Sequence, residues 1–390
     1  MTGLLAACLG RLPIGWLQLS HNKTRLFAAI AGVAFANILV FVQLGILGAL
    51  NGTIVVPYNL FQADILLSAS DANTLTDGSP IARARGFEAL GVPGVADMRP
   101  LYIGNFDWYH AEGGSSNVQV YGIDPAAEAF LSPPLNRKIA QLALEDTVVL
   151  DEATRGLPNN SFSSISAETP HSFEARNRTL SAVATVNIGG GFSADGVFIA
   201  ADQTFLRLFP ARFAGAPDHI LIKIEEGIDP TVVVDRISAV LPDTVQVRTL
   251  TDAAGDDQRY QTTQRPTGII FGLGVLIGML VGIVIVYQIL STDVADHLKE
   301  YATFKAMGYG HTFFLGIIFE QAAILAFLGF VPGFLISTAI YGGLSAAAGL
   351  PVEMDVIRAL SVFIGTVIAC AASGAVATRR LAAADPADLF

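Results

Sequence analysis

Few residues of this sequence have the types and the spacing that catalysis or metal binding requires. His110 and His171 are single histidines in polar, loop-like sequence, and no Cys/His spacing resembles a metal site. The two cysteines, Cys8 and Cys370, lie near the N-terminus and inside an apolar run, so a disulfide framework is not expected. We therefore expect a protein that is not an enzyme, with no catalytic residue, no metal site and no cofactor of its own.

Phosphate-binding patterns are also missing. The glycine-rich segment "IGGGFSADG", residues 188–196, lacks the Lys-Ser or Lys-Thr pair of a phosphate-binding loop, and we interpret it as a turn between strands. The pattern G-x-x-x-x-G-K-[ST] occurs nowhere in the 390 residues. If energy from ATP is used, a separate partner subunit must bind the nucleotide.

The charged segment "DHLKEYATFKAMGYG", residues 296–310, lies between two apolar runs. If residues 293–307 form a helix, the polar residues of that helix lie within one arc of about 120°. Phe304 and Met307 interrupt this arc. Gly308 is expected to end the helix. The arc consists of Asp293, Asp296, Lys299, Glu300 and Thr303. Helices that lie on a bilayer tend to be basic, whereas this one has three acids against two lysines. We therefore favour a helix that docks into a cleft of a partner protein. The alternative is an amphipathic loop helix that lies on the bilayer.

Four apolar runs determine the architecture around this segment. The chain is 52% hydrophobic and only 15% charged, and each run has at least the ~20 residues that cross a hydrocarbon core about 30 Å thick. We predict an α-helical membrane protein with four transmembrane helices and an external α+β domain. The predicted division is an interfacial amphipathic lead-in (1–25), transmembrane helix 1 (26–50), the external domain (51–265), transmembrane helix 2 (266–292), a coupling loop (293–311), transmembrane helix 3 (312–345), a short external loop (346–356), transmembrane helix 4 (357–378) and a tail (379–390).

Basic residues beside the apolar runs predict the orientation of the chain. Lysines and arginines are concentrated before the first run, between the second and third, and after the fourth, which indicates that both termini and the 293–311 loop are cytoplasmic. The first run is too long for a cleaved signal peptide and is expected to remain as an anchor. Residues 51–265 carry the whole net charge of −11, so nucleic acid is not an expected partner.

The external domain has the patterns of mixed α and β structure. "HILIKIEEGIDPTVVVDRISAVLPDTVQVRTL", residues 219–250, predicts a strand, a helix capped by Asp229 and a second strand. Val233, Ile237 and Val240 lie at helical spacing in this predicted helix. Further strands are predicted at 98–110, 117–124, 146–151 and 196–200.

Two features of the spans predict helix packing. Gly274, Gly278 and Gly282 line one face of the second span, for close contact either with a second copy of the chain or within one bundle.

Glu320 lies inside the third span, where a charge costs about 2.5–3.5 kcal/mol. We expect it to hydrogen-bond Asn37 of the first span. A protonated Glu320 bonded to a backbone carbonyl and a proton relay are the alternatives.

The order of these elements resembles a known family. Four spans, a large domain between the first two and "EYATFKAMGY" between spans two and three look like the FtsX-like, MacB-type permeases of ABC transporters. The segments "WLQLSHNKTRLFAAIAGVAFANILVFVQLG", "DHLKEYATFKAMGY" and "FLGFVPGFLIS" are similar to the DevC-type branch, best known from cyanobacterial glycolipid exporters.

This resemblance implies a permease subunit of a mechanotransmission (type VII) ABC exporter in a bacterial, for this branch cyanobacterial, inner membrane. It implies a homodimer with two cytoplasmic ABC ATPase subunits, which bind the ATP, and a periplasmic domain of MacB type. A periplasmic membrane-fusion adaptor and an outer-membrane channel would complete the path for a lipid or other amphiphile. The residues that would contact the ATPase are Asp296, Leu298, Glu300, Tyr301, Phe304, Lys305, Met307 and Gly308.

A second function is compatible with the same elements. An FtsX-like transmembrane regulator would activate a periplasmic cell-wall hydrolase through its external domain and would transport no substrate. The resemblance to the exporter branch extends over the whole chain, and the external domain is large, so the exporter function is favoured.

Overall fold

The computed structural model describes residues 13–110, 113–157, 162, 165–297, 300, 303–305 and 307–383. The chain forms two compact units. The helical unit comprises Met1–Gly48, Pro266–Ala348 and Val352–Phe390, and the sheet domain comprises Ala49–Arg265 with Gly349–Pro351.

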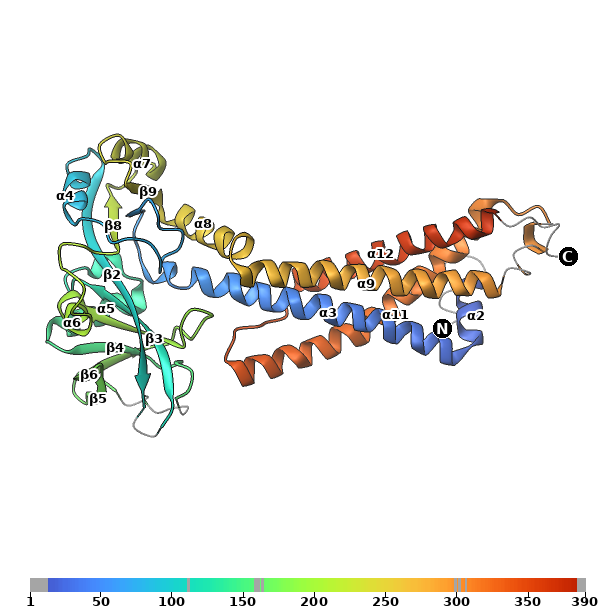
Figure 1. Ribbon diagram of the computed structural model, residues 1–390, viewed down its shortest axis with the longest axis horizontal. Coiled ribbons are helices and arrows are strands. Elements are labelled where there is room, and N and C mark those ends of the chain that lie inside the picture. Colours follow the sequence, from blue (N-terminus) through green and yellow to red (C-terminus); the bar gives the residue numbers. More distant parts are fainter. Residues whose placement is uncertain are drawn as a thin grey trace. The chain divides into compact units, whose positions relative to one another are not determined.

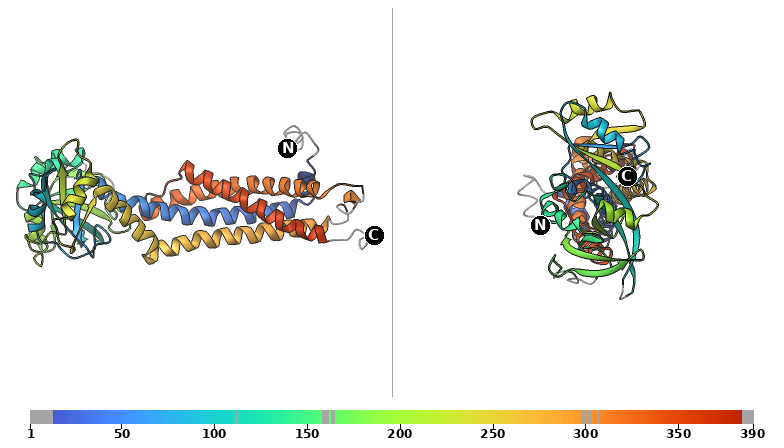
Figure 2. Two further views of the ribbon diagram at one scale, coloured as in Figure 1. Left: turned by 90° about the horizontal axis from the view of Figure 1, so that it is seen from above. Right: turned by 90° about the vertical axis from the view of Figure 1, so that its left-hand side faces the viewer.

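Within the described residues, four helices of the chain are long and apolar enough to cross a membrane. They are α3 (Lys23–Val55), α9 (Pro266–Asp296), α11 (His311–Ala348) and α12 (Val356–Ala383). The four helices lie alongside one another in Figures 1 and 2. A short helix, α2 (Ile14–His21), precedes α3 and packs against α11. The prediction of four apolar helices is confirmed.

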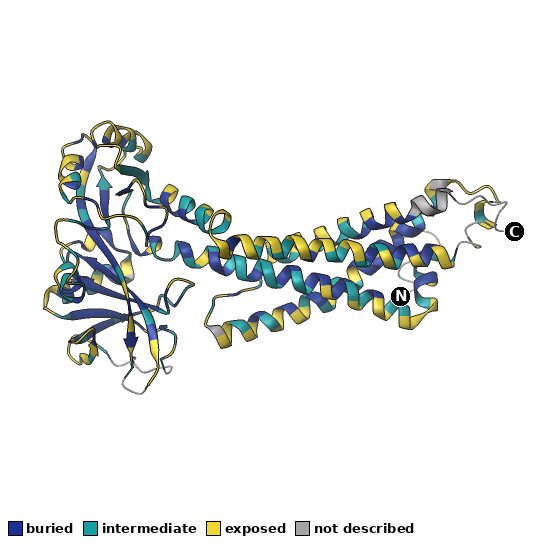
Figure 3. Cartoon of the chain, viewed as in Figure 1, coloured by how far each residue is buried: buried dark blue, intermediate teal, exposed yellow. Residues whose placement is uncertain are grey.

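The helical unit leaves large apolar side chains exposed. Figure 3 shows exposed residues along the helical unit. On α9 these include Ile270, Ile277 and Val284. Soluble proteins rarely leave so long an apolar row in contact with water. The row is therefore consistent with a helix that faces lipid.

The second part of the fold is one mixed sheet, which has nine strands within the described residues, in the order β5-β6-β4-β7-β3-β2-β8-β1-β9. The strands are β1 (Ile65–Ala69), β2 (Val95–Tyr109), β3 (Ser115–Ile123), β4 (Thr147–Asp151), β5 (His171–Ala175), β6 (Arg178–Val186), β7 (Gly196–Ala201), β8 (His219–Ile224) and β9 (Val245–Thr249). β3 pairs with β7 and β4 with β6 in parallel, and the other neighbours are antiparallel. The long hairpin of β2 and β3 is visible in Figure 1. The predicted mixed domain is confirmed.

Short helices cover this sheet. They are α4 (Ala84–Leu90), α5 (Pro133–Ile139), α6 (Asp202–Leu208), α7 (Pro230–Ser238) and α8 (Leu250–Thr263), with 3-10 turns at Tyr58–Leu60, Glu128–Phe130 and Ala140–Ala143. Asp229 caps α7 by accepting a hydrogen bond of 2.9 Å from the backbone N–H of Thr231. Val233 and Ile237 lie in α7 as predicted and are buried. The prediction that Val240 belongs to this helix is wrong: α7 ends at Ser238, and Val240 is 58% exposed.

The alternation of β3 separates two hydrophobic clusters on the two faces of the sheet. Val118 and Val120 are buried in one cluster, and Tyr121 and Ile123 are buried in the other. Gln119 has the same parity as Tyr121, so it points to the second face. This polar residue on a core-facing position is central to the site described below.

Candidate functional site

The predicted coupling segment begins at the end of α9. Asp296 is the last residue of α9 and forms an ion pair with Arg25 of α3. Glu300 Oε2 accepts a hydrogen bond of 3.2 Å from Gln18 Nε2 of α2. Gly308 has a φ of 94°, a left-handed conformation that glycine adopts without strain. The segment is therefore connected to two neighbouring helices of the bundle at its start.

Apolar side chains of this segment differ in exposure. Met307 is 60% exposed. Phe304 is only partly exposed, because its ring packs against Tyr309 and Phe313, with centroid distances of 5.8 Å to each. Lys305 is exposed. Of the remaining predicted contact residues, Leu298 and Tyr301 lie outside the described residues.

A buried polar network lies beneath the segment. Gln321 Nε2 donates hydrogen bonds to Asp293 Oδ2 at 2.7 Å and to Gln18 Oε1 at 3.2 Å. Asp293 and Gln321 are both buried. Asp293, which the sequence places on the polar arc, is thus turned into the bundle, where the last turn of α9 packs. Sequence reasoning missed Gln18 and Gln321; a glutamine beside Glu320 in an apolar run was the available signal.

The three glycines of α9 face α3 of the same chain. A Cβ at Gly278 would lie 3.1 Å from Val40 Cγ2, and one at Gly282 would lie 3.1 Å from Ala36 Cβ. A Cβ at Gly274 would overlap the amide of Gln43. Of the two arrangements left open by the sequence, the structure has the contact within one bundle.

The predicted hydrogen bond between Glu320 and Asn37 is not made. Glu320 Oε1 accepts from the backbone N–H of Trp16 at 3.2 Å, and Asn37 Oδ1 accepts from Thr366 Oγ1 at 2.6 Å. Asn37 lies beside Gly333, thirteen residues beyond Glu320 on α11 and therefore about 20 Å away along the helix. The prediction failed because the depth of each residue in the membrane was counted from the start of its own apolar run, and the two runs do not begin at the same position along the bundle.

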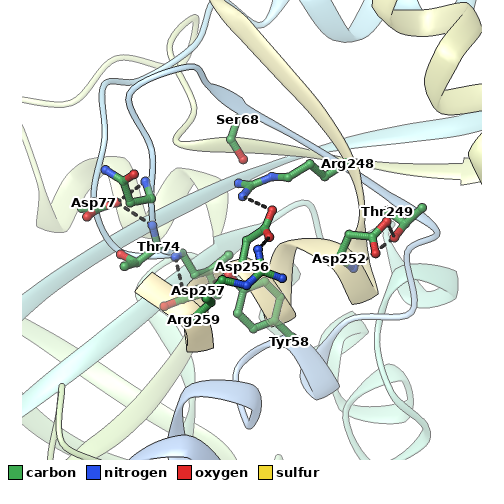
Figure 4. Close-up of polar contacts among 12 residues, drawn as sticks. Tyr58, Ser68, Thr74, Asp77, Arg248, Thr249, Asp252, Asp256, Asp257 and Arg259 are labelled. Atoms are coloured by element: carbon green, nitrogen blue, oxygen red, sulfur yellow. Dashed lines mark hydrogen bonds and ion pairs between the residues drawn. The ribbon is translucent and has the colours of Figure 1, made fainter. Parts of the chain in front are cut away.

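The sheet domain contains a second site, centred on Asp257 of α8. Asp257 is buried, and its Oδ2 accepts hydrogen bonds of 3.0 Å from both the Tyr58 hydroxyl and the Leu75 backbone N–H. Its Oδ1 accepts from Gln261 Nε2 at 3.1 Å. Burial raises the pKa of the Asp257 carboxyl above its ordinary value. Figure 4 shows Asp257 beside Tyr58.

Asp256, the residue before Asp257, contacts different residues. Its carboxylate forms ion pairs with Arg248 at 3.4 Å and with Arg259 at 3.0 Å (Figure 4). Both pairs are partly exposed and contribute little to stability on their own. The two adjacent carboxylates therefore have different roles, since Asp257 is buried and Asp256 forms ion pairs at the surface.

Asp257 lines a cavity of about 160 Å³ together with Gln119 of β3 and the glycine-rich segment 188–196. Apolar residues complete most of the wall, among them Ile54, Leu60 and Val197. No lysine, arginine or histidine lines the cavity within the part of the chain that the structure describes.

The glycine-rich segment connects β6 to β7, as predicted, and is held by two buried or partly buried charges. Asp151, which is fully buried, accepts hydrogen bonds of 3.0 Å from the backbone N–H groups of Ile188 and Gly189. The guanidinium of Arg155 donates to the carbonyls of Gly191 and, at 3.0 Å, Ala194. The wall of the cavity is thus fixed by side chains outside the segment, which no local sequence pattern indicates.

The C-terminal part of the chain matches a known family. Residues 272–386 match the model described as FtsX-like permease C-terminal. No curated protein matches the chain.

Two solved structures resemble the chain weakly. The periplasmic region of MacB from Actinobacillus actinomycetemcomitans has 11% identity and a TM-score of 0.34, and the match covers 50% of this chain and 92% of that one. The extracellular domain of the noncanonic ABC-type transporter YknZ from Gram-positive bacteria has 10% identity and a TM-score of 0.33, with 48% and 98% covered. The family match includes most of α9 and all of α11, so residues 272–386 are similar to the C-terminal region of FtsX-like permeases.

Proposed function

We propose that the protein is the permease subunit of a MacB-like mechanotransmission ABC exporter. The observation that carries the proposal is the FtsX-like match over residues 272–386, which contains the segment 296–308 between two apolar helices. A separate cytoplasmic ABC ATPase binds and hydrolyses ATP, and this chain supplies no catalytic group and binds no cofactor.

The segment 296–308 is the docking site of that ATPase in this proposal. Met307 is exposed and apolar on a segment between two helices that themselves face lipid or the bundle. Gln18 of α2 donates a hydrogen bond to Glu300 of the segment, and Gln321 of α11 donates one to Asp293 in the last turn of α9, which leads into the segment. Movement of the ATPase at Met307 is thus transmitted to the ends of several helices together.

The remaining partners follow from the exporter function. Two permease copies form a homodimer in a bacterial inner membrane, with both termini and the segment 296–308 in the cytoplasm. The sheet domain lies in the periplasm, where a membrane-fusion adaptor and an outer-membrane channel receive the substrate. The substrate is a lipid or another amphiphile that does not pass through the four helices.

The test is the capture of the ATPase of the same transport system by the tagged full-length chain in detergent. Met307→Ala removes a side chain whose burial in a cleft contributes about 1.5–3 kcal/mol, so we expect about ten-fold or greater weakening of capture. Met279→Ala is the matched control, because Met279 is a 47% exposed methionine on α9 outside the segment. Equal capture by wild type, Met307→Ala and Met279→Ala would remove the segment as the docking site.

A further inference from the structure

The loop between α11 and α12 belongs to the sheet domain, although both helices belong to the helical unit. α11 ends at Ala348, and the residues that follow, Gly349–Pro351, form one compact unit with Ala49–Arg265. The chain returns to the helical unit at Val352, before α12 begins at Val356. A short connection between two apolar helices is thus held by residues from a distant part of the sequence.

Arg155 of the sheet domain contacts this loop at Gly349. Gly349 has a φ of 60°, and a Cβ added there would lie 2.6 Å from Arg155 Cδ and 2.8 Å from its Cγ. Glycine is therefore what allows the aliphatic stem of Arg155 to lie against the loop backbone. Arg155 is itself held in place, because its guanidinium forms an ion pair of 3.2 Å with Asp195 and its backbone N–H donates to the Asp195 carbonyl at 2.9 Å.

The head group of the same arginine holds the glycine-rich segment 188–196. It donates hydrogen bonds to the carbonyls of Gly191 and, at 3.0 Å, Ala194. Inside the segment, the Gly191 N–H donates to the Ala194 carbonyl at 2.8 Å. One side chain therefore contacts the loop with its stem and the segment with its guanidinium, so a displacement of the loop changes the support of the segment.

The end of α3 meets the same segment. A Cβ at Gly191 would lie only 3.0 Å from Thr53 Cβ, so the two backbones approach closely. Thr53 and Pro351 both line the cavity that the segment walls, together with Asp257 of α8, the helix that precedes α9. The chain running to or from each of the four apolar helices thus reaches the sheet domain at this one cavity.

We propose that Gly349–Pro351 is a latch, which ties the connection between α11 and α12 to the segment 188–196 through Arg155. A displacement at this connection moves the cavity wall directly, without passing through α3 or α9. The use of the latch in transmitting movement rests on the proposed function, whereas the latch itself is a property of this chain alone.

Amide hydrogen exchange of the full-length chain in lipid nanodiscs, without ATPase or nucleotide, tests the latch from the loop side. Gly349→Ala places a Cβ in the space of the Arg155 stem, so the loop or the arginine must shift. We expect the amides of segment 188–196 to exchange about ten-fold faster than in the wild type, because the segment loses support and opens more often.

Gly227→Ala is the matched control for backbone strain. Gly227 also has a positive φ, of 85°, but a Cβ there would meet nothing within 4 Å. The control should leave exchange in segment 188–196 unchanged.

A cross-link tests the same contact in an independent way. Because a Cβ at Gly349 would lie 2.8 Å from Arg155 Cγ, the pair Arg155→Cys and Gly349→Cys is within reach of a disulfide. With Cys8 and Cys370 replaced by alanine, oxidation by O2 with copper phenanthroline should join the two positions, as detected by mass spectrometry of the digested chain. The pair Arg155→Cys and Gly227→Cys should remain reduced.

Three results would overturn the proposal. They are equal exchange in segment 188–196 for Gly349→Ala and the wild type, equal acceleration by Gly227→Ala, and no cross-link between positions 155 and 349. Neither measurement involves the ATPase, so failure here with normal ATPase capture would leave the permease function standing.

Discussion

His219 shows how burial determines the protonation state of one side chain in the sheet domain. Its Nε2 lies 2.8 Å from the carbonyl oxygen of Leu75, which can only accept, so Nε2 carries the proton and Nδ1 accepts from Ser68 Oγ at 2.9 Å. Burial lowers the pKa of His219 below its ordinary value of 6.5. Because the Leu75 N–H donates to Asp257, His219 also holds the backbone that supports the cavity.

We predict that His219 makes the sheet domain less stable in mild acid. Well above pH 6.5 the imidazole is neutral in both the folded and the unfolded state, and the group adds no pH dependence. As the pH falls below 6.5 the unfolded chain takes up a proton that folded His219 does not. The free energy of unfolding then falls by up to about 1.4 kcal/mol per pH unit, until the pH reaches the lower pKa of the folded state.

The measurement is unfolding of the full-length chain followed by tryptophan fluorescence between pH 7 and pH 5. Trp16→Phe leaves the buried Trp108 as a reporter of the sheet domain, since the chain has two tryptophans. His219→Gln keeps a donor for Leu75 and cannot titrate, so its stability should be lower at pH 7 but less dependent on pH. Identical slopes for the two proteins would contradict the assignment of a neutral buried His219.

Single-residue partners were the least predictable part of the site. The sequence indicates that Glu320, Asn37 and Asp293 are polar residues at the ends or in the middle of apolar helices. The sequence does not show how far the helices are shifted along one another. This shift determines that Glu320 hydrogen-bonds the backbone of Trp16 and that Asp293 hydrogen-bonds Gln321. Gln119 could have been found, because it occupies a core-facing position of an alternating strand.

Glycines of α9 make close contacts with α3. Gly278 and Gly282 leave no room for a side chain beside Val40 and Ala36, whereas a Cβ at Gly272 would meet nothing within 4 Å. The same helix therefore offers one glycine face that packs and another that does not. Small residues let helix backbones approach closely in a membrane.

We predict that Gly278→Leu destabilises the helical unit by about 1–3 kcal/mol, the usual cost of overpacking, and that Gly272→Leu changes its stability by less than about 0.5 kcal/mol. The melting temperature of the full-length chain in detergent measures both. If Gly278→Leu instead dissociates a dimer and leaves the melting temperature of the monomer unchanged, the glycine face packs against a second copy.

Elements were predicted better than their packing. Uninterrupted apolar runs indicate the four helices, and alternation with turn residues indicates strands such as β2, β3 and β7 (196–201). The role of 188–196 as a cavity wall was not predictable, because Asp151 and Arg155, which hold it, are distant in sequence. The packing of α2 on α11 was missed because the eight residues of α2 resemble any short interfacial helix.

At the scale of the whole molecule, the sheet domain is continuous with two of the apolar helices. Its first residue, Ala49, lies within α3, and its last large segment ends at Arg265, one residue before α9 begins. At the other end of α9, Asp296 begins the proposed ATPase docking segment. A single helix thus connects that segment covalently to the sheet domain.

The central claim is that ATP used by a separate subunit moves the sheet domain. The most direct measurement is pulsed electron paramagnetic resonance between spin labels on Phe213→Cys in the two permease copies, with the native cysteines replaced. Phe213 is 73% exposed, so a label there should not disturb the core. With the ATPase bound, we expect the distance distribution to shift between the ADP and the ATP-trapped states. Identical distributions in an actively hydrolysing complex would contradict the claim.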